Sequence, residues 1–421
     1  MPSIDRRHFV LGSGAAVLGS LAQPLDRLAV HVGGREELKV GLIGCGGRGT
    51  GAVINALNAD PAAKLVAMCD VFPDRLDASL GRLQKSQHAA RIQVDEDHRF
   101  TGFDGYKHLI EAVDVVLLAA TPHFRPRHLA AAVRAGKHVF CEKPVAVDVP
   151  GVRSVMETSA LAAKNGTSLV SGLCYRYDTP KREVMKRIHD GAVGRIVALQ
   201  CTYNTGGLWH RGSKPEWSDM EYQIRNWLYF TWLSGDHIAE QSIHSLDKIL
   251  WAMQDEPPVK VTASGGRINR IEPKYGNVFD HFNTVFEWKS GVKLFHSCRQ
   301  WAGADSDVSD YVFGTEGVAA IQRHSIKGAN AWRWRGRSPS MYDNEHVALF
   351  RAIRENKPIN NGDYMCKATL MAIMGRMSAY TGKTITWDEL MKSKLNLTPE
   401  RYEFGPHPVA PVARPGKTPF V

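Results

Sequence analysis

The chain has 421 residues, of which 43% are hydrophobic and 23% are charged. Its length suggests about two domains, and its composition is that of a globular protein, which excludes disordered and collagen-like classes. The net charge of +10 arises from basic residues spread among acidic ones without a long basic run, so we expect no nucleic-acid partner.

Residues 1–30 have the pattern of an export signal. The pair Arg6 and Arg7 precedes an apolar run that is rich in small residues and reaches Ala22, where small side chains suit a cleavage site. The run is too short for a membrane anchor. The paired arginines resemble a twin-arginine signal, although Asp5 stands where Ser or Thr is usual. We therefore expect export to the periplasm or beyond, by a route that carries folded proteins, rather than a frayed amphipathic N-terminus, and we expect no stable membrane anchor.

Short apolar runs alternate with helical segments between residues 38 and 168. The runs LKVGLIG, KLVAMCD, VDVVLLAAT and HVFCEKP are strand-like, and helical segments separate them. Strict alternation of strand and helix predicts a parallel sheet covered by helices on both faces. We therefore expect an α/β fold with an N-terminal Rossmann domain over residues 38–168.

The first predicted strand ends in a glycine-rich turn, Gly44-x-Gly46-x-x-Gly49, and the next strand ends in Asp70. In this context the glycines let backbone N–H groups approach a pyrophosphate at a helix N-terminus, and the carboxylate hydrogen-bonds the ribose hydroxyls. Because Asp70 also repels a 2′-phosphate, we expect NAD, with NADP less favoured. Arg48 in the turn is a candidate phosphate or adenine contact. The alternative is a glycine-rich turn followed by an unrelated acid.

The pattern changes in the second half of the chain, residues 169–390. The segments SLVSGLCYR, IVALQCTYN, VKVTASGGRI, DHFNTVFEWKSG and VKLFHSCRQW are longer, and in part they alternate apolar with polar residues. Residues 289–291 are typical of a hairpin turn between the last two segments. We therefore expect a C-terminal α+β domain with a largely antiparallel open sheet.

The C-terminal part of the chain contains a predicted loop, two predicted helices and a tail. Residues 327–338 are rich in Gly, Trp and Arg, and we expect them to form an irregular loop. Residues 343–356 and 364–380 have helical character, and we expect them to pack back across the domain junction. Residues 391–421 are expected to form a C-terminal tail.

The segment GDHIAEQSIHSLD concentrates titratable side chains. At roughly 100° per residue, Asp236, His237, Glu240, His244 and Asp247 fall on one side of a helix, with apolar residues on the other. The polar side of this helix could be solvated, could bind a metal, or could line a catalytic cleft.

Several motifs of the chain occur together in one family of enzymes. CEKP stands at residues 141–144 directly after a predicted strand, Thr-Pro stands at 121–122, and GLCYRYDTPKREVMKRIHDGAVGRI occupies residues 172–196. With the glycine-rich turn, this set resembles the glucose–fructose oxidoreductase/inositol dehydrogenase (Gfo/Idh/MocA) family over nearly the whole chain. The resemblance implies an N-terminal dinucleotide domain, a C-terminal sheet domain that cups the substrate, and hydride chemistry on a sugar, a cyclitol or a related polyol.

The resemblance also implies catalytic roles for Lys143, Glu240 and His244. Family members commonly carry an Asp and, four residues later, a His at the start of a helix, and these join the EKP lysine around the reacting carbinol. In this chain Glu240 replaces the usual Asp and adds one methylene of reach. Imidazole is suited to removing the hydroxyl proton as hydride leaves, and a lysine ammonium can stabilise the developing alkoxide.

The predicted contacts form a cofactor set and a substrate set. Polar and aromatic side chains at strand ends suit sugar hydroxyls and ring faces, which selects the substrate set. No metal centre is predicted, although His237, Glu240 and His244 together could bind a divalent metal. The predicted cofactor contacts are Gly44, Gly46, Gly47, Arg48, Gly49, Asp70, Thr121, Pro122, Glu142 and Lys143, and the predicted substrate contacts are Arg176, His210, His237 and His281.

Three functions are consistent with these motifs. The first is an exported NAD-dependent oxidoreductase for a sugar, glycoside or cyclitol hydroxyl, with a tightly bound cofactor because free NAD is not expected outside the cytoplasm. The second is a redox-assisted glycosidase or lyase that oxidises a ring hydroxyl, eliminates the aglycone and reduces the ring again. The third is a non-catalytic sugar-binding protein on a dehydrogenase scaffold. The expected partner is a small sugar or glycoside, and we expect a homo-oligomer formed through the C-terminal sheet.

Overall fold

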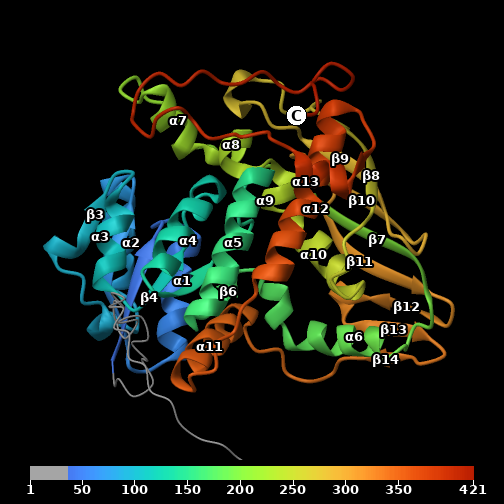
Figure 1. Cartoon of the computed structure of the whole chain (residues 1–421), viewed down its shortest axis with the longest axis horizontal. Helices are drawn as coiled ribbons and strands as arrows, with labels where there is room; N and C mark the ends of the chain where they lie inside the picture. The colour runs from blue at the N-terminus through green and yellow to red at the C-terminus, as the bar shows by residue number, and fades with distance from the viewer. Residues whose placement is uncertain (1–36) are drawn as a thin grey trace, which may run out of the picture.

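A computed structural model describes residues 37–421 and places them around two sheets. Figure 1 shows the N-terminal sheet with its helices on one side of the molecule and the larger second sheet on the other. The predicted fold class is confirmed: a parallel Rossmann-type sheet is followed by an α+β domain with a mainly antiparallel sheet. The predicted export signal at residues 1–30 lies outside the described residues.

The first sheet has six strands in the order β3-β2-β1-β4-β5-β6, and every neighbouring pair is parallel. Its central strands are almost entirely buried because helices cover both faces. The strands are β1 (Leu38–Ile43), β2 (Ala63–Asp70), β3 (Arg99–Thr101), β4 (Val115–Leu118), β5 (His138–Cys141) and β6 (Leu169–Ser171), and the helices are α1 (Gly47–Ala59), α2 (Pro73–Leu83), α3 (Gly105–Ala112), α4 (Arg125–Arg134) and α5 (Val149–Asn165).

The assignment of the segment SLVSGLCYR to the second sheet is wrong. Its residues 169–171 form β6, which pairs in parallel with β5 and completes the first sheet. Gly172 follows directly, and the chain then enters a 3-10 turn at Cys174–Tyr177 instead of continuing as a strand. The apolar run is therefore shorter than predicted and belongs to the N-terminal sheet.

The second sheet has nine strands in the order β14-β13-β12-β11-β7-β10-β9-β8-β15. Only β10 with β7 is a parallel pair among the described strands of this sheet. The predicted hairpin turn is confirmed, since β9 and β10 pair in antiparallel fashion around Gly291, which has a φ of 85°. The strands are β7 (Ile196–Thr205), β8 (Lys260–Gly266), β9 (His281–Glu287), β10 (Lys293–Gln300), β11 (Asp307–Gly314), β12 (Gly317–Ala320), β13 (Ser325–Gly328), β14 (Trp332–Arg333) and β15 (Ile385–Thr386).

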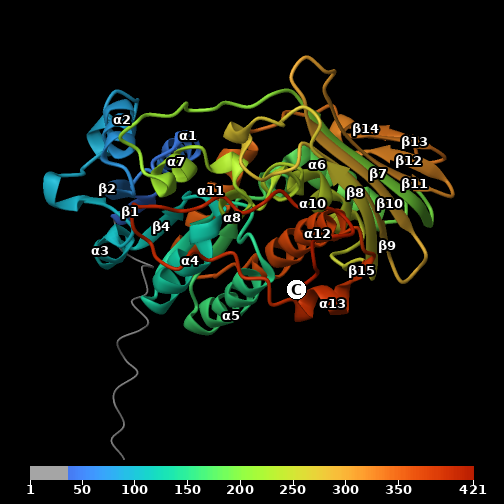
Figure 2. The ribbon, with the colours of Figure 1, turned by 90° about the horizontal axis from the view of Figure 1, so that it is seen from above.

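The predicted loop at residues 327–338 is partly wrong, because it contains the end of β13 and the short strand β14, which pairs in antiparallel fashion with the first residues of β13. The two late helices are confirmed as α11 (Met341–Arg354) and α12 (Gly362–Thr381). Both lie at the domain junction, with α11 against α1 and α12 between α5 and β8 (Figures 1 and 2).

Shorter helices complete the second domain. One of them, α10, packs with α12 over one face of the nine-stranded sheet. Within residues 37–421, no helix combines the length and the apolar character needed to cross a membrane. The helices are α6 (Thr179–His189), α7 (Asp219–Arg225), α8 (Thr231–Ser234), α9 (His237–Glu240), α10 (Ile243–Ala252) and α13 (Trp387–Lys392), with 3-10 turns at Ala89–Arg91, Glu96–His98, Pro122–Phe124, Cys174–Tyr177, Trp227–Tyr229, Pro273–Tyr275 and Ile321–Arg323.

Candidate active site

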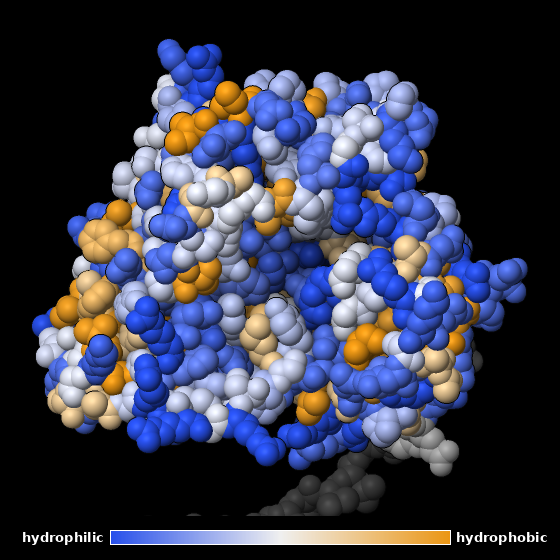
Figure 3. Space-filling model, turned by 180° about the vertical axis from the view of Figure 1, so that it is seen from behind, coloured by the Kyte–Doolittle hydropathy of each residue, from blue (hydrophilic) through white to orange (hydrophobic). Residues whose placement is uncertain are grey.

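A cavity of about 540 Å³ lies where the carboxyl ends of the first sheet's strands meet the second domain. Figure 3 shows a hollow lined mainly by hydrophilic side chains on the face opposite to that of Figure 1. The cavity brings together residues that lie far apart in the sequence. Of the residues predicted for the site, those that line it are Gly44, Gly46, Gly47, Arg48, Gly49, Asp70, Thr121, Glu142, Lys143, Glu240 and His244.

The glycines of the first turn divide into two groups. A Cβ atom on Gly44, whose φ is 98°, would lie 2.3 Å from the main-chain N of Ala120, and one on Gly49 would lie 1.9 Å from the carbonyl O of Gly44. These two positions are closed by packing. Gly46 and Gly47 have nothing within 4 Å of a built Cβ, so the N-terminus of α1 is open toward the cavity. An open helix N-terminus fits the phosphates of a dinucleotide.

Asp70 is fixed by the main chain at the end of β2. Its Oδ2 accepts a hydrogen bond of 2.7 Å from Cys45 N, and its Oδ1 accepts one of 3.0 Å from Phe72 N. Burial raises the pKa of Asp70, and these two donors oppose the rise. Each carboxylate oxygen has a further lone pair, so Asp70 can still accept hydrogen bonds from ribose hydroxyls.

Arg48 lines the cavity, and two acidic side chains already engage its guanidinium group. Its Nε donates to Glu142 Oε1 at 2.5 Å, and its Nη2 donates to Glu345 Oε1 at 2.7 Å. It also stacks over the rings of Phe140 and Tyr342. Arg48 therefore ties the glycine-rich turn to the end of β5 and to α11.

Glu142 and Gly172 form a close contact behind the cavity. The Oε2 atom of Glu142 accepts a 3.0 Å hydrogen bond from Lys143 N. A Cβ atom on Gly172 would lie 2.8 Å from the Glu142 carboxyl carbon, so only glycine leaves room for this carboxylate. Burial opposes ionisation of Glu142, but Arg48 and Lys143 outweigh it and lower the pKa of Glu142. We conclude that Glu142 is an ionised group that positions Lys143.

Lys143 reaches the second domain through Glu240. Its Nζ donates a hydrogen bond to the carbonyl O of Glu240 and lies 3.8 Å from the Oε1 of the same residue. The two side chains are mostly shielded from solvent, with 15% and 18% of their surfaces exposed. An ammonium group held at this place can stabilise negative charge on a substrate oxygen.

His244 is a neutral imidazole at the cavity wall. Its ring packs edge-on against Tyr175, with centroids 5.2 Å apart. Its Nδ1 is buried and has no hydrogen-bond partner among the described residues. Burial lowers the pKa of His244 well below the usual value, and the nearby ammonium groups of Lys143 and Lys248 lower it further. A neutral imidazole in a cavity can accept a proton from a substrate hydroxyl.

The single polar helix predicted for the segment GDHIAEQSIHSLD is wrong. The segment is divided between the short helix α9 and the start of α10, and Asp236 between α8 and α9 has a φ of 69°. The Asp236 carboxylate accepts hydrogen bonds from His237 N, from Phe279 N and from the hydroxyl of Tyr380. These contacts hold the chain in a conformation that L-residues rarely adopt.

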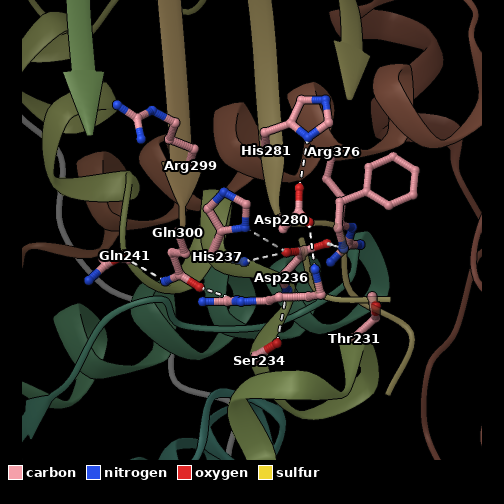
Figure 4. Close-up of polar contacts among 12 residues, drawn as sticks. Thr231, Ser234, Asp236, His237, Gln241, Asp280, His281, Arg299, Gln300 and Arg376 are labelled. Atoms are coloured by element: carbon pink, nitrogen blue, oxygen red, sulfur yellow. Dashed lines mark hydrogen bonds and ion pairs between the residues drawn. The ribbon is translucent and has the colours of Figure 1, made fainter. Parts of the chain in front are cut away.

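Figure 4 shows that the predicted substrate contacts His237 and His281 belong to a separate polar network. His237 is buried, and its Nδ1 lies 3.0 Å from Asp236 Oδ1. Burial opposes its charged form, but the neighbouring Cys298 and Asp236 side chains raise the pKa of His237 to about 10. The Nδ1 of His281 lies 2.8 Å from Asp280 Oδ1. Neither histidine lines the cavity, which corrects both predictions.

Arg176 is a structural residue, not a substrate contact. Its guanidinium group donates to Asp247 at 2.8 Å and to Asp255 at 2.6 Å, and only 8% of its side chain is exposed. Its guanidinium carbon also lies 4.2 Å from the ring centroid of Tyr364. All of its charge is therefore compensated away from the cavity.

Two further predicted residues lie beside the cavity without lining it. His210 turns toward α7, where its Nε2 lies 3.2 Å from the Tyr222 hydroxyl, and its neighbours Trp209 and Arg211 line the cavity in its place. Pro122 is buried in a 3-10 turn directly after Thr121, which does line the cavity. The lining residues therefore lie next to His210 and Pro122 in the chain.

Sequence reasoning missed most of the aromatic and cationic wall of the cavity. The segment YNTGGLWHRG carried a signal, since it combines aromatic and basic residues, but its orientation depends on the second domain. The missed or displaced lining residues include Phe72, Phe103, Cys174, Trp209, Arg211, Arg225, Trp227 and Tyr342.

The predicted site residues do not assemble into a metal centre. Within residues 37–421, no group of three His, Cys, Asp or Glu side chains is arranged to hold a metal ion. His237 contacts Asp236 outside the cavity, whereas Glu240 and His244 line the cavity. The site therefore offers a neutral imidazole, an ammonium group and a carboxylate beside an open glycine-rich turn, which together suit proton transfer next to a bound dinucleotide.

Comparisons with known proteins agree with this arrangement. Residues 38–172 match the family described as "Oxidoreductase family, NAD-binding Rossmann fold", and residues 182–320 match "GFO/IDH/MocA C-terminal domain". Inositol 2-dehydrogenase 3 of Saccharopolyspora erythraea is 24% identical over 321 residues, which are 73% of this chain and 82% of that protein. The 2,7-anhydro-N-acetylneuraminate hydratase of Escherichia coli is 27% identical over 219 residues, covering 52% of this chain and 54% of that protein.

The same architecture is present in solved structures. The crystal structure of aldose-aldose oxidoreductase from Caulobacter crescentus, complexed with glycerol, superimposes with a TM-score of 0.65 and is 20% identical. The match covers 83% of this chain and 99% of that chain. This likeness extends over both domains and shows a shared fold.

Proposed function

Because the chain belongs to the Gfo/Idh/MocA oxidoreductase family, we propose that it oxidises a hydroxyl of a sugar, glycoside or cyclitol with tightly bound NAD. The observation that carries this proposal is the meeting of Lys143 and His244 at the same cavity as the open glycine-rich turn. Relatives that include an inositol dehydrogenase support a polyol substrate.

Residues of the first domain would hold the cofactor. Gly46 and Gly47 leave the N-terminus of α1 free for the pyrophosphate, Asp70 offers carboxylate oxygens to the adenosine ribose, and Thr121 has a buried hydroxyl without a partner among the described residues. NAD bound there would supply the hydride acceptor for oxidation of the substrate carbon.

The chain's own residues would handle the proton. His244 accepts the hydroxyl proton, and its depressed pKa keeps it neutral and ready to do so. Lys143 stabilises the developing negative charge on the same oxygen, while the carbonyl of Glu240 holds its ammonium group in place. The Glu240 carboxylate, 3.8 Å from Lys143 Nζ, orients that group or a substrate hydroxyl.

A second candidate is bond cleavage without net redox change. In this sequence the sugar hydroxyl is oxidised to a ketone, the adjacent carbon loses a proton as the aglycone leaves, water adds to the resulting double bond, and the ketone is reduced again. The E. coli relative, whose name describes a hydratase, favours this candidate. The third candidate, sugar binding without catalysis, leaves the shielded Lys143 and the neutral His244 without a role.

Product analysis distinguishes the three candidates. Purified protein is mixed with free sugars, cyclitols and glycosides, and both the products and the oxidation state of the bound cofactor are followed. An oxidised product together with a reduced cofactor supports net oxidation. Release of aglycone without lasting reduction supports the second candidate. Binding without any product supports the third and contradicts our proposal.

Export and self-association complete the proposal. The arginine pair at Arg6 and Arg7 and the following apolar run support export by the twin-arginine route to the periplasm or beyond, which detection of the cleaved chain outside the cytoplasm would test. The uncovered face of the second sheet carries Phe295, which is 53% exposed, beside Val285, which is 36% exposed. This exposed apolar face supports a homo-oligomer. Light scattering tests it, because the Phe295→Asp variant should then have a smaller molar mass in solution than the wild type.

A further inference from the structure

A long arm of the second domain reaches across the cavity to the first domain. Residues 206–229 leave β7, cross over the molecule as shown in Figure 2, and include α7. Arg225 of α7 forms two hydrogen bonds with Asp74, of 2.9 and 3.1 Å, and its guanidinium carbon lies 3.9 Å above the ring of Phe72. The arm also supplies cavity wall, namely Trp209, Arg211, Ile224, Arg225 and Trp227.

The C-terminal tail lies over the same place from the other side. Figure 1 shows residues 393–421 running over the top of the molecule to α7 and back to the second sheet. The ring of Phe404 stacks on Phe72 with centroids 5.7 Å apart and planes at 12°. The Tyr402 hydroxyl lies 2.9 Å from His123 Nε2. The tail therefore connects directly to the rim of the first domain's cavity.

The tail is anchored at both ends and joined to the arm. Leu397 N donates to Asp148 at 2.8 Å near its start, and Gly416 N donates to the carbonyl O of Thr381 at 2.8 Å near its end. Between these anchors, Gly405 accepts a hydrogen bond from Met220 N, and His407 accepts one from the Gln223 side chain. We call residues 206–229 and 393–421 together the clasp.

Phe72 is the centre of the clasp. It follows β2 two residues after Asp70, the residue that fits the adenosine ribose, and it is 5% exposed. Arg225 covers its ring from the arm and Phe404 stacks on it from the tail. The arm therefore forms part of the cavity wall beside Asp70, whereas the tail packs against Phe72 without lining the cavity itself.

Two arginines in this part of the cavity lack a partner for their charge. Arg211 and Arg75 both line the cavity, and neither side chain makes a hydrogen bond or an ion pair within residues 37–421. The guanidinium carbon of Arg211 lies 4.5 Å from the Trp209 ring centroid. Of the two acids near Arg75, Asp74 is paired with Arg225 and Asp70 is held by main-chain donors. Burial lowers the pKa of Arg75 and the nearby Arg211 guanidinium group lowers it further, although Asp70 and Asp74 oppose this. Two neighbouring cations without an ion pair of their own favour binding of an anion.

We infer that the clasp retains the AMP half of the dinucleotide in the cavity, with Arg211 of the second domain as a ligand for its phosphate group. This inference rests on the proposed function and adds to it the elements that retain the cofactor. Release then requires the arm and the tail to separate from Phe72. The cofactor would thus remain bound through successive turnovers.

The test measures loss of cofactor from the purified holoenzyme. Phe404→Ala removes the stack from the tail, Arg225→Gln removes both the ion pair and the ring contact from the arm, and Arg211→Met removes the unpaired cation. Each variant is passed repeatedly through gel filtration, and the NAD that remains is quantified by mass spectrometry after denaturation. Arg401→Met is the matched control, because the Arg401 side chain is exposed on the tail and pairs only with Glu403 among the described residues.

We expect each clasp variant to release NAD roughly tenfold faster than the wild type, since cation–π and ion-pair contacts of this kind contribute on the order of 1 kcal/mol or more. Arg401→Met should match the wild type. Release from all three variants at the wild-type rate would overturn the inference while leaving the proposed function intact. A wild type that neither contains nor binds NAD would instead overturn the proposed function, and the clasp with it. Thermal unfolding of each variant without cofactor identifies a variant that loses NAD because it is misfolded. The inference is then judged on the variants that fold as the wild type does.

Discussion

Lys143 and Glu240 meet across the domain junction: the lysine Nζ donates to the glutamate carbonyl O and lies 3.8 Å from its Oε1. The two residues are 97 positions apart in the sequence. Lys143 follows β5 of the parallel sheet, whereas Glu240 ends α9 shortly before His244. The catalytic groups are therefore assembled from both domains, and the contact between them sets where the lysine ammonium group lies.

The first prediction concerns the proton-transfer groups. His244→Ala and Lys143→Ala should each slow the chemical step by roughly 10²- to 10⁴-fold while the amount of bound NAD stays the same. Glu240→Gln should slow it less, because the carbonyl that holds Lys143 is retained. Rapid mixing of the holoenzyme with substrate measures the step. The control is His98→Ala, a surface histidine paired with Asp95. Wild-type turnover in His244→Ala would show that the imidazole is only part of the cavity wall.

A second prediction separates structure from function at Arg176. Because Asp247 is 1% exposed and paired with Arg176, Arg176→Met leaves a buried carboxylate without its cation. We expect the free energy of unfolding to fall by roughly 3–5 kcal/mol, measured by urea denaturation. Lys186→Met, which breaks an exposed pair with Asp190, should cost about 1 kcal/mol or less. If Arg176→Met instead raised KM at unchanged stability, the sequence-based assignment as a substrate contact would be right.

A third prediction compares the two carboxylates that share Arg48. Burial raises the pKa of Glu345 well above its usual value, with Glu142 adding to the rise, whereas the pKa of Glu142 is lowered. We predict that Glu345 is the protonated member of the two, so Glu345→Gln should change the free energy of unfolding by less than about 1 kcal/mol, because an amide would replace a neutral acid. Glu142→Gln removes the only ionised partner of Arg48 among the described residues and should cost roughly 3–5 kcal/mol. Equal losses in urea denaturation would contradict this assignment of charge.

A fourth prediction concerns acid stability. Burial lowers the pKa of His128 and His346 to about 3 and that of His123 and His138 to about 4. Below the usual histidine pKa of about 6.5, the unfolded chain binds protons that the folded chain does not. Above that pH these histidines leave the free energy of unfolding unchanged. As the pH falls from about 6.5 toward about 4, the free energy of unfolding decreases by up to roughly 1.4 kcal/mol per pH unit for each histidine. Denaturant unfolding at a series of pH values measures this slope, and a flat profile between these limits would contradict it.

Much of the fold could be predicted because its signals are local. Alternation of apolar runs with helices identified the parallel sheet, and the turn at residues 289–291 identified the β9–β10 hairpin. The broken helix could not be predicted, because Asp236 holds its unusual backbone through hydrogen bonds with Phe279 N and the Tyr380 hydroxyl, which are distant in sequence. The sheet to which β6 belongs was likewise decided by pairing with β5 and not by its own three residues.

The candidate site divides in the same way. Sequence motifs identified Lys143, Glu240 and His244, and the structure brings all three to one cavity. Arg176 and His237 had equally suitable chemistry, but buried acids engage them elsewhere. The acidic partners of Arg176 and His237 are set by the packing of the second domain, which the sequence motifs do not describe. The wall that the arm contributes was missed for the same reason, because its place beside Asp70 is set by contacts between the domains.

The small molecule that the purified protein carries shows whether this cavity holds NAD tightly for hydride chemistry. Protein purified without added cofactor is denatured, and the released small molecules are identified and counted by mass spectrometry. We predict NAD or NADH at close to one molecule per chain. Protein that is empty, and that binds added NAD with a Kd no lower than about 1 mM, equivalent to roughly −4 kcal/mol, would show that the cavity is not a tight NAD site.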